Sequence, residues 1–238
     1  MISRLTEIFQ IFIQIITLNF YRKQLVRSIL EISFYSLPVI FLTSFFTGAV
    51  LTMQASAGLS FISGPVTLSK IVVSSIVKEL GPVLTGLMIS GRIASALAAE
   101  ISTMKVSDQI DALRTLNVSP SKLLVVPKVV ASLISMPILI IIADFIAFFG
   151  SWVIATQTLQ YNGTLYSYAM FEQLKLFDFN IGLLKAVIFG FIITYIGTYS
   201  GLNADGSSAG VGKATTIAVV TSSILILVSN YIVTFLFF

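Results

Sequence analysis

Four charged residues lie within long apolar stretches of this chain, and they are its best candidates for chemistry: Arg92, Glu100, Asp144 and Lys185. A charged side chain inside a membrane span costs about 2.5–3.5 kcal/mol on insertion scales, and such residues usually face a helix-bundle interior or a cavity. Arg92 and Glu100 are separated by eight residues, about 12 Å along a helix, so we expect each to have its partner elsewhere. The four residues are expected to form either structural ion pairs or part of a substrate pathway.

The composition indicates an integral membrane protein and excludes several kinds of chemistry. Of the 238 residues, 56% are hydrophobic and only 10% are charged, whereas soluble domains contain about 25% charged residues. Because the chain has no cysteine and no histidine, it can form no disulfide, thiol nucleophile, His-based metal site or Ser-His-Asp triad. The net charge of +4 comes mostly from basic residues that flank apolar segments, which indicates membrane topology rather than nucleic-acid binding.

An all-α integral membrane fold is predicted, with residues 1–238 in one domain. Residues 2–20 are predicted to form an interfacial helix, because polar residues interrupt an apolar run that no signal-peptide cleavage site follows. Five membrane-spanning helices are predicted after it, each with at least about the 20 residues that a bilayer requires: 32–54, 71–104, 123–156, 181–200 and 215–238. Pro82 and Pro137 lie inside the long second and third spans, which are expected to tilt or kink.

The distribution of lysine and arginine predicts the orientation of the spans. Basic residues gather before the first span and in the segment 105–128, which indicates that both lie on the cytoplasmic or stromal side. Lys78 and Glu79 are expected near the headgroups, at the outer end of the second span. The segment 201–212 is expected to be a flexible connection. Its Gly210-Val-Gly-Lys213 run is no phosphate-binding loop, because Ser207 and Ala214 stand where a Walker A motif has glycine and Ser or Thr.

Small residues recur at four-residue intervals in the second span, and Gly91, Ser95 and Ala99 form a neighbouring row. Small residues in such rows let helix backbones approach closely in lipid. The main row is expected either to pack against helices of the same chain or to form a subunit interface or sliding surface. Its members are Gly86, Ser90, Ala94, Ala98 and Ser102.

A short amphipathic helix is predicted between the second and third spans, at 107–117. Ser107 is expected to be its N-cap, with Asp108 in the first turn and Arg114 in the last, which matches the helix dipole. Asn117 and Pro120 are expected to end it, and Ile110, Leu113 and Leu116 form an apolar stripe. The helix either rests on the membrane or docks a partner protein, and docking is the preferred interpretation. The candidate docking residues are Ser107, Asp108, Ile110, Asp111, Leu113 and Arg114.

The run from Glu79 to Pro120, ELGPVLTGLMISGRIASALAAEISTMKVSDQIDALRTLNVSP, resembles the signature region of MlaE-type permeases of ABC transporters. The similarity continues at Pro127 and Pro137 in the third span, resumes at Lys185 and at residues 208–216, and covers nearly the whole chain from about Leu37. The resemblance implies a homodimer with an interfacial helix and five spans per subunit. It also implies soluble ABC ATPase subunits on the cytoplasmic side and a lipid-binding MCE-domain protein on the opposite side.

The resemblance assigns roles to particular residues. Ser107–Leu116 corresponds to the coupling helix that the ATPase moves, and ATP and Mg²⁺ belong to that partner, so this chain is not itself an enzyme. The family's lipid cavity lies at the dimer interface, and its charged intramembrane positions match Glu100 and Lys185, near which Arg92 is a further candidate. Asn230 is a departure, because the family commonly has an acidic residue there in the last span.

The expected function is ATP-driven movement of phospholipid or another glycerolipid between membranes. The alternatives are an ATPase-independent secondary transporter or channel, with the buried charges as its ion path, and a structural subunit of a membrane complex. The richness in Ile, Phe, Ser and Asn and the lack of a transit peptide slightly favour a plastid inner envelope over a bacterial inner membrane.

Overall fold

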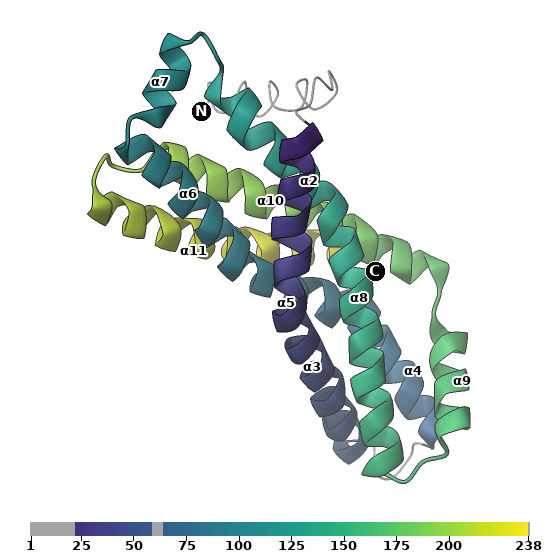
Figure 1. The fold of residues 1–238 in the computed structure, drawn as a ribbon. Helices are drawn as coiled ribbons and strands as arrows, with labels where there is room; N and C mark the ends of the chain where they lie inside the picture. The colour runs from purple at the N-terminus through teal and green to yellow at the C-terminus, as the bar shows by residue number, and fades with distance from the viewer. Residues whose placement is uncertain (1–21, 59–63, 238) are drawn as a thin grey trace. The chain divides into compact units, whose positions relative to one another are not determined.

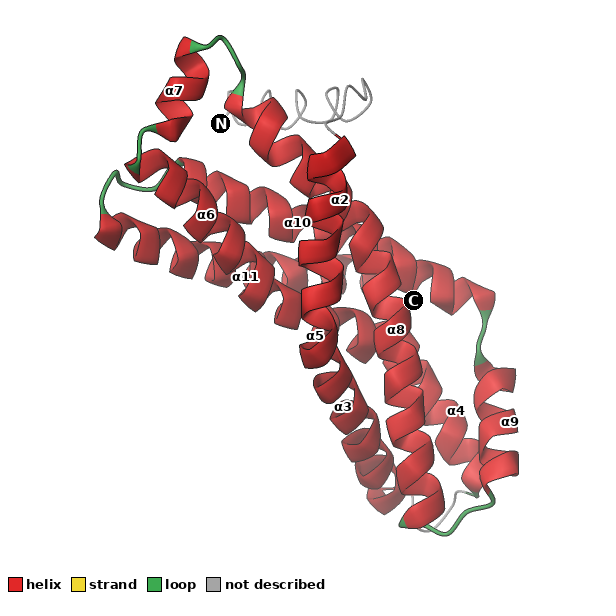
Figure 2. Cartoon of the chain, viewed as in Figure 1, coloured by secondary structure: helices red, strands yellow, loops and turns green. Residues whose placement is uncertain are grey.

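The computed structural model describes residues 22–58 and 64–237, and the regular elements within these ranges are helices (Figures 1 and 2). The predicted interfacial helix at 2–20 lies outside the described residues. The helices are α2 (Arg22–Ser33), α3 (Leu37–Gly58), α4 (Pro65–Ser75), α5 (Gly81–Ile89), α6 (Ser95–Val106), α7 (Gln109–Thr115), α8 (Val126–Gln157), α9 (Gly163–Gln173), α10 (Leu176–Leu202) and α11 (Ser208–Phe237). Short turns of tighter or wider helix connect some of them: η1 (Phe34–Ser36), η2 (Ile76–Leu80), η3 (Ser90–Ala94) and η4 (Ser121–Val125).

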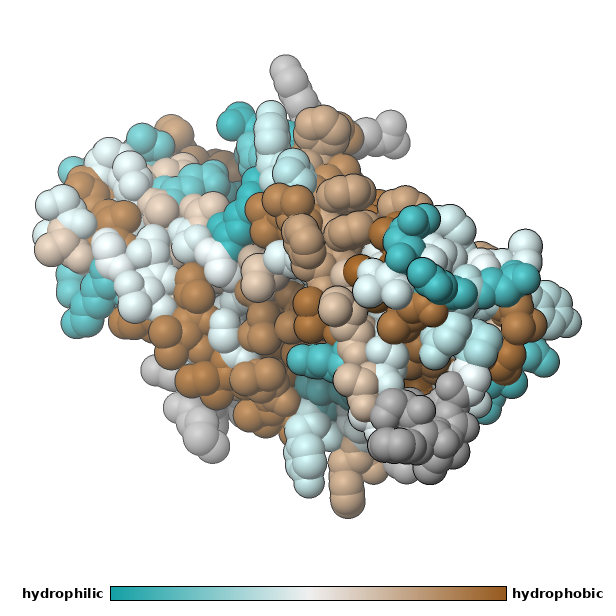
Figure 3. Space-filling model, turned by 90° about the horizontal axis from the view of Figure 1, so that it is seen from below, coloured by the Kyte–Doolittle hydropathy of each residue, from teal (hydrophilic) through white to brown (hydrophobic). Residues whose placement is uncertain are grey.

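Five continuous helical segments are long and apolar enough to cross a membrane within the described ranges: Gln24–Gly58, Pro65–Val106, Ser121–Gln157, Leu176–Leu202 and Ser208–Phe237. The prediction of an all-α protein with five spans is therefore confirmed. Each segment begins before its predicted span because caps, rather than hydropathy, set helix ends; the second, for example, begins with Pro65 after an extended Gly64. Large apolar side chains remain exposed on these helices, and brown apolar patches appear on the face shown in Figure 3. A lipid bilayer would cover such surface.

The helices form two compact units, each built from separate segments of the chain. The first unit comprises Met1–Ser36, Ile89–Met136 and Val187–Val228, and the second comprises Leu37–Met88, Pro137–Ala186 and Ser229–Phe238. Pro137 marks the division inside α8. A proline inside a helix interrupts the hydrogen-bond ladder, which fits a change of unit at this residue.

The second unit is held by close helix contacts and a buried polar chain. A Cβ atom added at Gly48 of α3 would lie 1.9 Å from the carbonyl oxygen of Ala147 in α8, so the two helices touch backbone to backbone. Nearby, Thr52 donates to Ser151 over 2.7 Å, and Ser151 and the Tyr166 hydroxyl are 2.8 Å apart. Tyr166 belongs to α9, which lies beside α4 (Figure 1); its burial raises the pKa of the phenol.

In the first unit, the row of small residues packs α6 against α10 and α11 of the same chain. A Cβ added at Gly197 would lie 3.0 Å from the Ala94 carbonyl oxygen, and one at Gly201 would lie 3.0 Å from that of Ala98. Ser90 Oγ lies 2.7 Å from Ser222 Oγ. Ser90, Ala94, Ala98 and Ser102 are buried in these contacts, while Gly86 is buried in the second unit.

Two segments outside the predicted spans are largely helical. The segment after the third span contains α9, which Asn162 caps by accepting from the backbone N–H groups of Thr164 and Leu165. The expectation of a flexible connection at 201–212 is wrong, since α10 continues to Leu202 and α11 begins at Ser208. Ser207 caps α11, because its Oγ accepts from the N–H of Gly210 over 3.1 Å. Gly201 and Gly210 are closely packed, since a Cβ added at Gly201 would lie 2.8 Å from Cβ of Ile101 and one added at Gly210 would lie 2.3 Å from the carbonyl oxygen of Asp205.

Gly81 follows a π-helical turn, Ile76–Leu80, and touches a buried carboxylate. A Cβ at position 81 would lie 1.8 Å from Oδ1 of Asp144, an oxygen that is buried and accepts no hydrogen bond from the described residues. We predict that Gly81→Ala destabilises the protein by about 1–3 kcal/mol, because overpacking a filled site costs that much. Asp144→Ala in the same chain should restore most of the loss, because the carboxylate is what blocks the methyl group.

Thermal unfolding in detergent micelles, followed by the fluorescence of Trp152, the single tryptophan, measures both effects. Gly212→Ala is the matched control, since nothing lies within 4 Å of its added Cβ. It should leave the unfolding temperature unchanged or raise it slightly, because alanine favours helix over glycine. Failure of Asp144→Ala to rescue Gly81→Ala would show that the clash lies elsewhere.

Candidate functional site

A buried lysine anchors the candidate site in the second unit. Lys185 of α10 has no exposed surface, and its ammonium group donates three hydrogen bonds. The acceptors are the carbonyl oxygen of Lys78 at 2.7 Å, Thr234 Oγ1 at 2.9 Å and Glu79 Oε1 at 3.1 Å. A lysine ammonium has three donors, so the hydrogen-bonding capacity of this buried charge is fully used.

The local sequence explains why a main-chain acceptor is available there. Pro82 has no N–H, so the carbonyl oxygen of Lys78, four residues earlier, receives no bond from it. The π-helical turn Ile76–Leu80 shifts the pattern further, because the N–H of Gly81 bonds to the carbonyl oxygen of Ile76. Gly182 brings α10 close to this turn, since a Cβ there would lie 3.2 Å from the carbonyl oxygen of Val77. One helical turn later, Lys185 meets the freed carbonyl.

Glu79 is the acidic partner of Lys185, and two side chains of α11 complete the cluster. Asn230 Nδ2 donates to Glu79 Oε2 over 2.8 Å, and Thr234 Oγ1 donates to Glu79 Oε1 over 2.7 Å. The Glu79 side chain is 37% exposed, so the carboxylate is the group through which the cluster reaches the surface. We call Glu79, Lys185, Asn230 and Thr234 the lysine cluster.

The sequence missed this pairing, because Glu79 and Lys78 were expected near the headgroups. Glu79 instead bonds to the buried Lys185, and Lys78 Nζ lies 3.3 Å from Asp178 Oδ1. One feature of the sequence could have indicated this pairing. Glu79 stands three residues before Pro82 and next to Lys78, whose carbonyl oxygen receives no helical hydrogen bond from the proline. The acid that pairs with Lys185 comes from the second span, and the last span contributes the neutral Asn230.

Arg92 and Glu100 line a pocket of the first unit, and each has its own partner, as expected from their separation. Arg92 Nη1 donates to Ser36 Oγ over 2.6 Å and to the carbonyl oxygen of Glu31 over 3.2 Å. Glu100 pairs with Lys128 Nζ at 2.5 Å. Lys128 was not among the predicted site residues, although it is buried at the start of α8.

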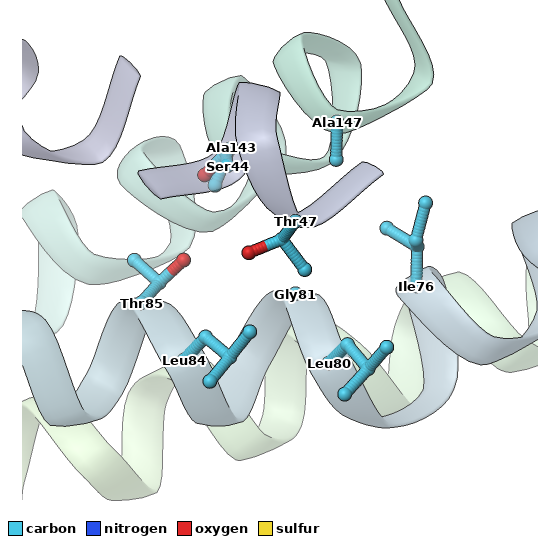
Figure 4. Close-up of a pocket in the computed structure, with 9 residues that line it drawn as sticks. All are labelled: Ser44, Thr47, Ile76, Leu80, Gly81, Leu84, Thr85, Ala143 and Ala147. Atoms are coloured by element: carbon cyan, nitrogen blue, oxygen red, sulfur yellow. The ribbon is translucent and has the colours of Figure 1, made fainter. Parts of the chain in front are cut away.

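Two other pockets lie within the second unit. Asp144 and Lys175 line a largely apolar pocket of about 180 Å³. On the other side of Gly81, a space of about 10 Å³ lies between α3, α5 and α8, with Thr47 and Thr85 facing it (Figure 4). A space of this size holds at most one water molecule, so it is a packing gap and not a lipid site.

The short helix α7 forms where it was predicted, but Ser107 does not cap it. The residue before α7 is Asp108, whose φ of 56° is left-handed, and its side chain makes no capping bond. Ser107 ends α6 and bonds back to the carbonyl oxygen of Thr103 over 2.9 Å. At the other end, α7 ends before Asn117, the residue that was expected to end it. Asn117 has a φ of 57°, and the bond from Val118 N–H to the Leu113 carbonyl, 3.0 Å long, forms a Schellman motif.

In the apolar stripe of α7, two residues are packed against the first unit and one is exposed. Ile110 is buried against Ile101 and Leu124, and Leu113 packs at the edge of the same cluster. Leu116, by contrast, is 72% exposed, and the exposed Asp111 and Arg114 pair over 2.9 Å. Ile110 and Leu113 therefore fix α7 to the first unit, and Asp111, Arg114 and Leu116 form its outer face. Leu116 was not among the predicted docking residues.

The lysine cluster generates a prediction on stability. We expect Glu79→Gln to destabilise the protein by about 3 kcal/mol, the lower end of the range for removing one partner of a buried pair, because Glu79 is partly exposed. Lys185→Met should cost less, since Asn230 and Thr234 still donate to the remaining carboxylate. The double variant should resemble Lys185→Met. Unfolding temperatures in detergent test this order, with the exposed Lys213→Met as control, and equal stability of Glu79→Gln and the natural protein would contradict it.

Known proteins resemble this chain along almost all of its length. The family described as "Permease MlaE" matches residues 25–236. A probable ABC transporter permease protein of Rickettsia felis is 48% identical over 92% of this chain and 84% of its own length. The probable ABC transporter permease protein ycf63 of Pyropia yezoensis is 32% identical over 99% and 90%. The intermembrane phospholipid transport system permease protein MlaE of Haemophilus influenzae is 33% identical over 90% and 82%. The chain thus belongs to the MlaE family of ABC transporter permeases, as its signature region indicated.

Proposed function

We propose that this chain moves a phospholipid, or another glycerolipid, between membranes, with energy from a separate ABC ATPase. The observation that carries the proposal is the similarity, over 90% of this chain, to a permease of an intermembrane phospholipid transport system. The proposal requires no ATP site on this chain, because the separate ATPase would hydrolyse the ATP. The exposed apolar surface of the five spans is suited to lipid.

The outer face of α7 is the proposed contact with the ATPase. The helix is fixed to the first unit by Ile110 and Leu113 and presents Asp111, Arg114 and Leu116 outward. In the chain, α7 lies between α6 and α8. Because α7 is held in this way, a movement of α7 can be transmitted to both helices. The docking residues proposed from the sequence keep this role, except that Ile110 and Leu113 act as anchors and Ser107 belongs to α6.

The remaining parts of the proposed assembly follow from the family. Two copies of the chain would form the permease, with the row of Gly91, Ser95 and Ala99 less buried than its neighbour and open to such a contact. An MCE-domain protein would bind the side opposite the ATPase. The N-terminus is assigned to the cytoplasmic or stromal side; the Rickettsia felis relative supports a bacterial inner membrane, and the ycf63 relative supports a plastid envelope.

The function is tested by reconstitution. The chain and its co-purifying ATPase are placed in liposomes with fluorescent phospholipid, and transfer to acceptor vesicles is followed with and without ATP. ATP-dependent transfer that stops with an inactive ATPase is the expected result. Absence of any ATPase from the purified complex, or a flux that needs only an ion gradient, would favour the ATPase-independent transporter.

The α7 contact gives a separate prediction. Asp111→Ala together with Arg114→Ala, or Leu116→Asp alone, should reduce ATPase co-purification at least about ten-fold, since each removes exposed docking groups. Stability should change by less than about 1 kcal/mol, because exposed ion pairs contribute little. The matched control removes another exposed pair, Lys70 and Glu172, which lie 3.4 Å apart. Undiminished ATPase binding by both α7 variants would remove the coupling assignment.

A further inference from the structure

A charged pocket of about 160 Å³ lies in the first unit between α2, α6 and the start of α8. Polar lining comes from Glu31 and Ser28 of α2, Arg92 of η3, Glu100 of α6 and Lys128 of α8, and apolar lining from Ile32, Ile93, Ala96 and Leu97. Lys128 and Ser28 are buried. The pocket therefore combines fixed charges with an apolar wall.

The charges around this pocket leave one cation without an ion pair among the described residues. Glu31 pairs with Arg27 at 2.8 Å, and Glu100 pairs with Lys128 at 2.5 Å. Arg92 makes its bonds to neutral acceptors only, the Ser36 hydroxyl and the Glu31 carbonyl oxygen. The lining thus contains two acidic and two basic groups, and Arg92 is the lining cation that has no ion pair among the described residues.

The hydrogen bonds of Arg92 also fix the orientation of its guanidinium group. Both are donated by Nη1, so Nε and Nη2 have no acceptor within the described part of the chain. A guanidinium with two free donors on one edge matches an anion with two oxygens, such as a phosphate. Ser36 holds the Arg92 side chain in place, since its own hydroxyl donates to the carbonyl oxygen of Ile32 over 2.6 Å.

The surface of α2 beside the pocket is suited to lipid rather than to water. Val26, Leu30 and Phe34 are spaced four residues apart, hence on one face, and are 56%, 53% and 63% exposed. Tyr35, which lines the pocket, packs against Phe34 with ring centroids 5.8 Å apart. Apolar residues with a tyrosine beside charged groups are typical of the region where lipid headgroups meet acyl chains.

We propose that the pocket between α2, α6 and α8 binds the phosphate group of a phospholipid, with Arg92 as the phosphate ligand and the apolar face of α2 against the acyl chains. The site deepens the proposed lipid pathway, and it rests on that proposal only in taking lipid as the ligand. Glu31 and Glu100 hold the flanking cations in their own pairs, which leaves Arg92 as the cation available to the anion.

The test is equilibrium lipid binding without ATP or ATPase, so that its failure and a failure of transport are distinguishable. The full chain in detergent is titrated with dioleoyl phosphatidylglycerol and analysed by native mass spectrometry. Dioleoylglycerol has the same acyl chains without phosphate, and inorganic phosphate provides the anion without chains. Phosphatidylglycerol should bind, dioleoylglycerol should bind at least about ten-fold more weakly, and millimolar inorganic phosphate should not displace the lipid.

Two variants assign the binding to this pocket. Arg92→Gln should weaken phosphatidylglycerol binding at least about ten-fold, the effect of losing charge-assisted hydrogen bonds. Ala96→Phe should block the pocket while it leaves every charge in place, which keeps the test valid if Arg92→Gln folds poorly. Lys213→Gln removes one charge from an exposed position of α11 and should leave binding unchanged.

Three results would overturn the proposal. The first is equal binding of phosphatidylglycerol by the natural chain, Arg92→Gln and Ala96→Phe. The second is equal binding of phosphatidylglycerol and dioleoylglycerol, since the phosphate would then play no part. The third is displacement of the lipid by inorganic phosphate in an Arg92-dependent manner, which would identify free phosphate as the ligand.

Discussion

The ammonium group of Lys185 is the constraint on which the second unit depends. A buried cation is tolerated only when it is paired and hydrogen-bonded, and all three of its donors here find acceptors on other segments. Two acceptors come from the second span and the third from α11. The second span, α10 and α11 must therefore stay close enough to one another to keep these hydrogen bonds. Because any separation would leave a charge unpaired in an apolar surrounding, this interaction limits which movements the unit can make.

The π-helical turn Ile76–Leu80 makes this arrangement possible and ties it to a second contact. It ends at Leu80, two residues before Pro82, so that the Lys78 carbonyl is available to Lys185, and it carries Glu79 toward α10 and α11. At its end, Gly81 faces α8 and touches the Asp144 carboxylate. A π-helical turn contains one residue more than an α-helical turn, and such insertions are frequent at functional sites. A change of this turn toward regular helix would alter both contacts at once, which couples α8 to the lysine cluster.

The sequence predicted what depends on local patterns and missed what depends on distant partners. The five spans and the position of α7 follow from runs of apolar residues and from Asn117, whose left-handed conformation ends the helix. Nothing in the sequence near Lys185 indicates that its partner is Glu79, more than a hundred residues earlier. Ser107 was a reasonable cap by residue type, but its hydroxyl bonds back into α6, which local propensity does not distinguish from capping. Helix α9 was missed because eleven residues are too few for a span and its pattern of buried residues is short.

Asn230 shows how one residue sets the charge of the lysine cluster. With asparagine at this position the cluster has one cation and one carboxylate, whereas an acidic residue here would place a second carboxylate beside Glu79. The Asn230 amide donates to Glu79, and its own Oδ1 is buried and has no hydrogen-bond partner in the part of the chain that the structure describes. Rotating the amide would turn that oxygen toward the carboxylate, so the orientation is fixed by repulsion even though an acceptor remains unsatisfied. An acid could make the same bond only in its protonated form, since an ionised carboxylate has no donor. This chain therefore keeps the cluster neutral without binding a proton, and its charge balance does not depend on the protonation of residue 230.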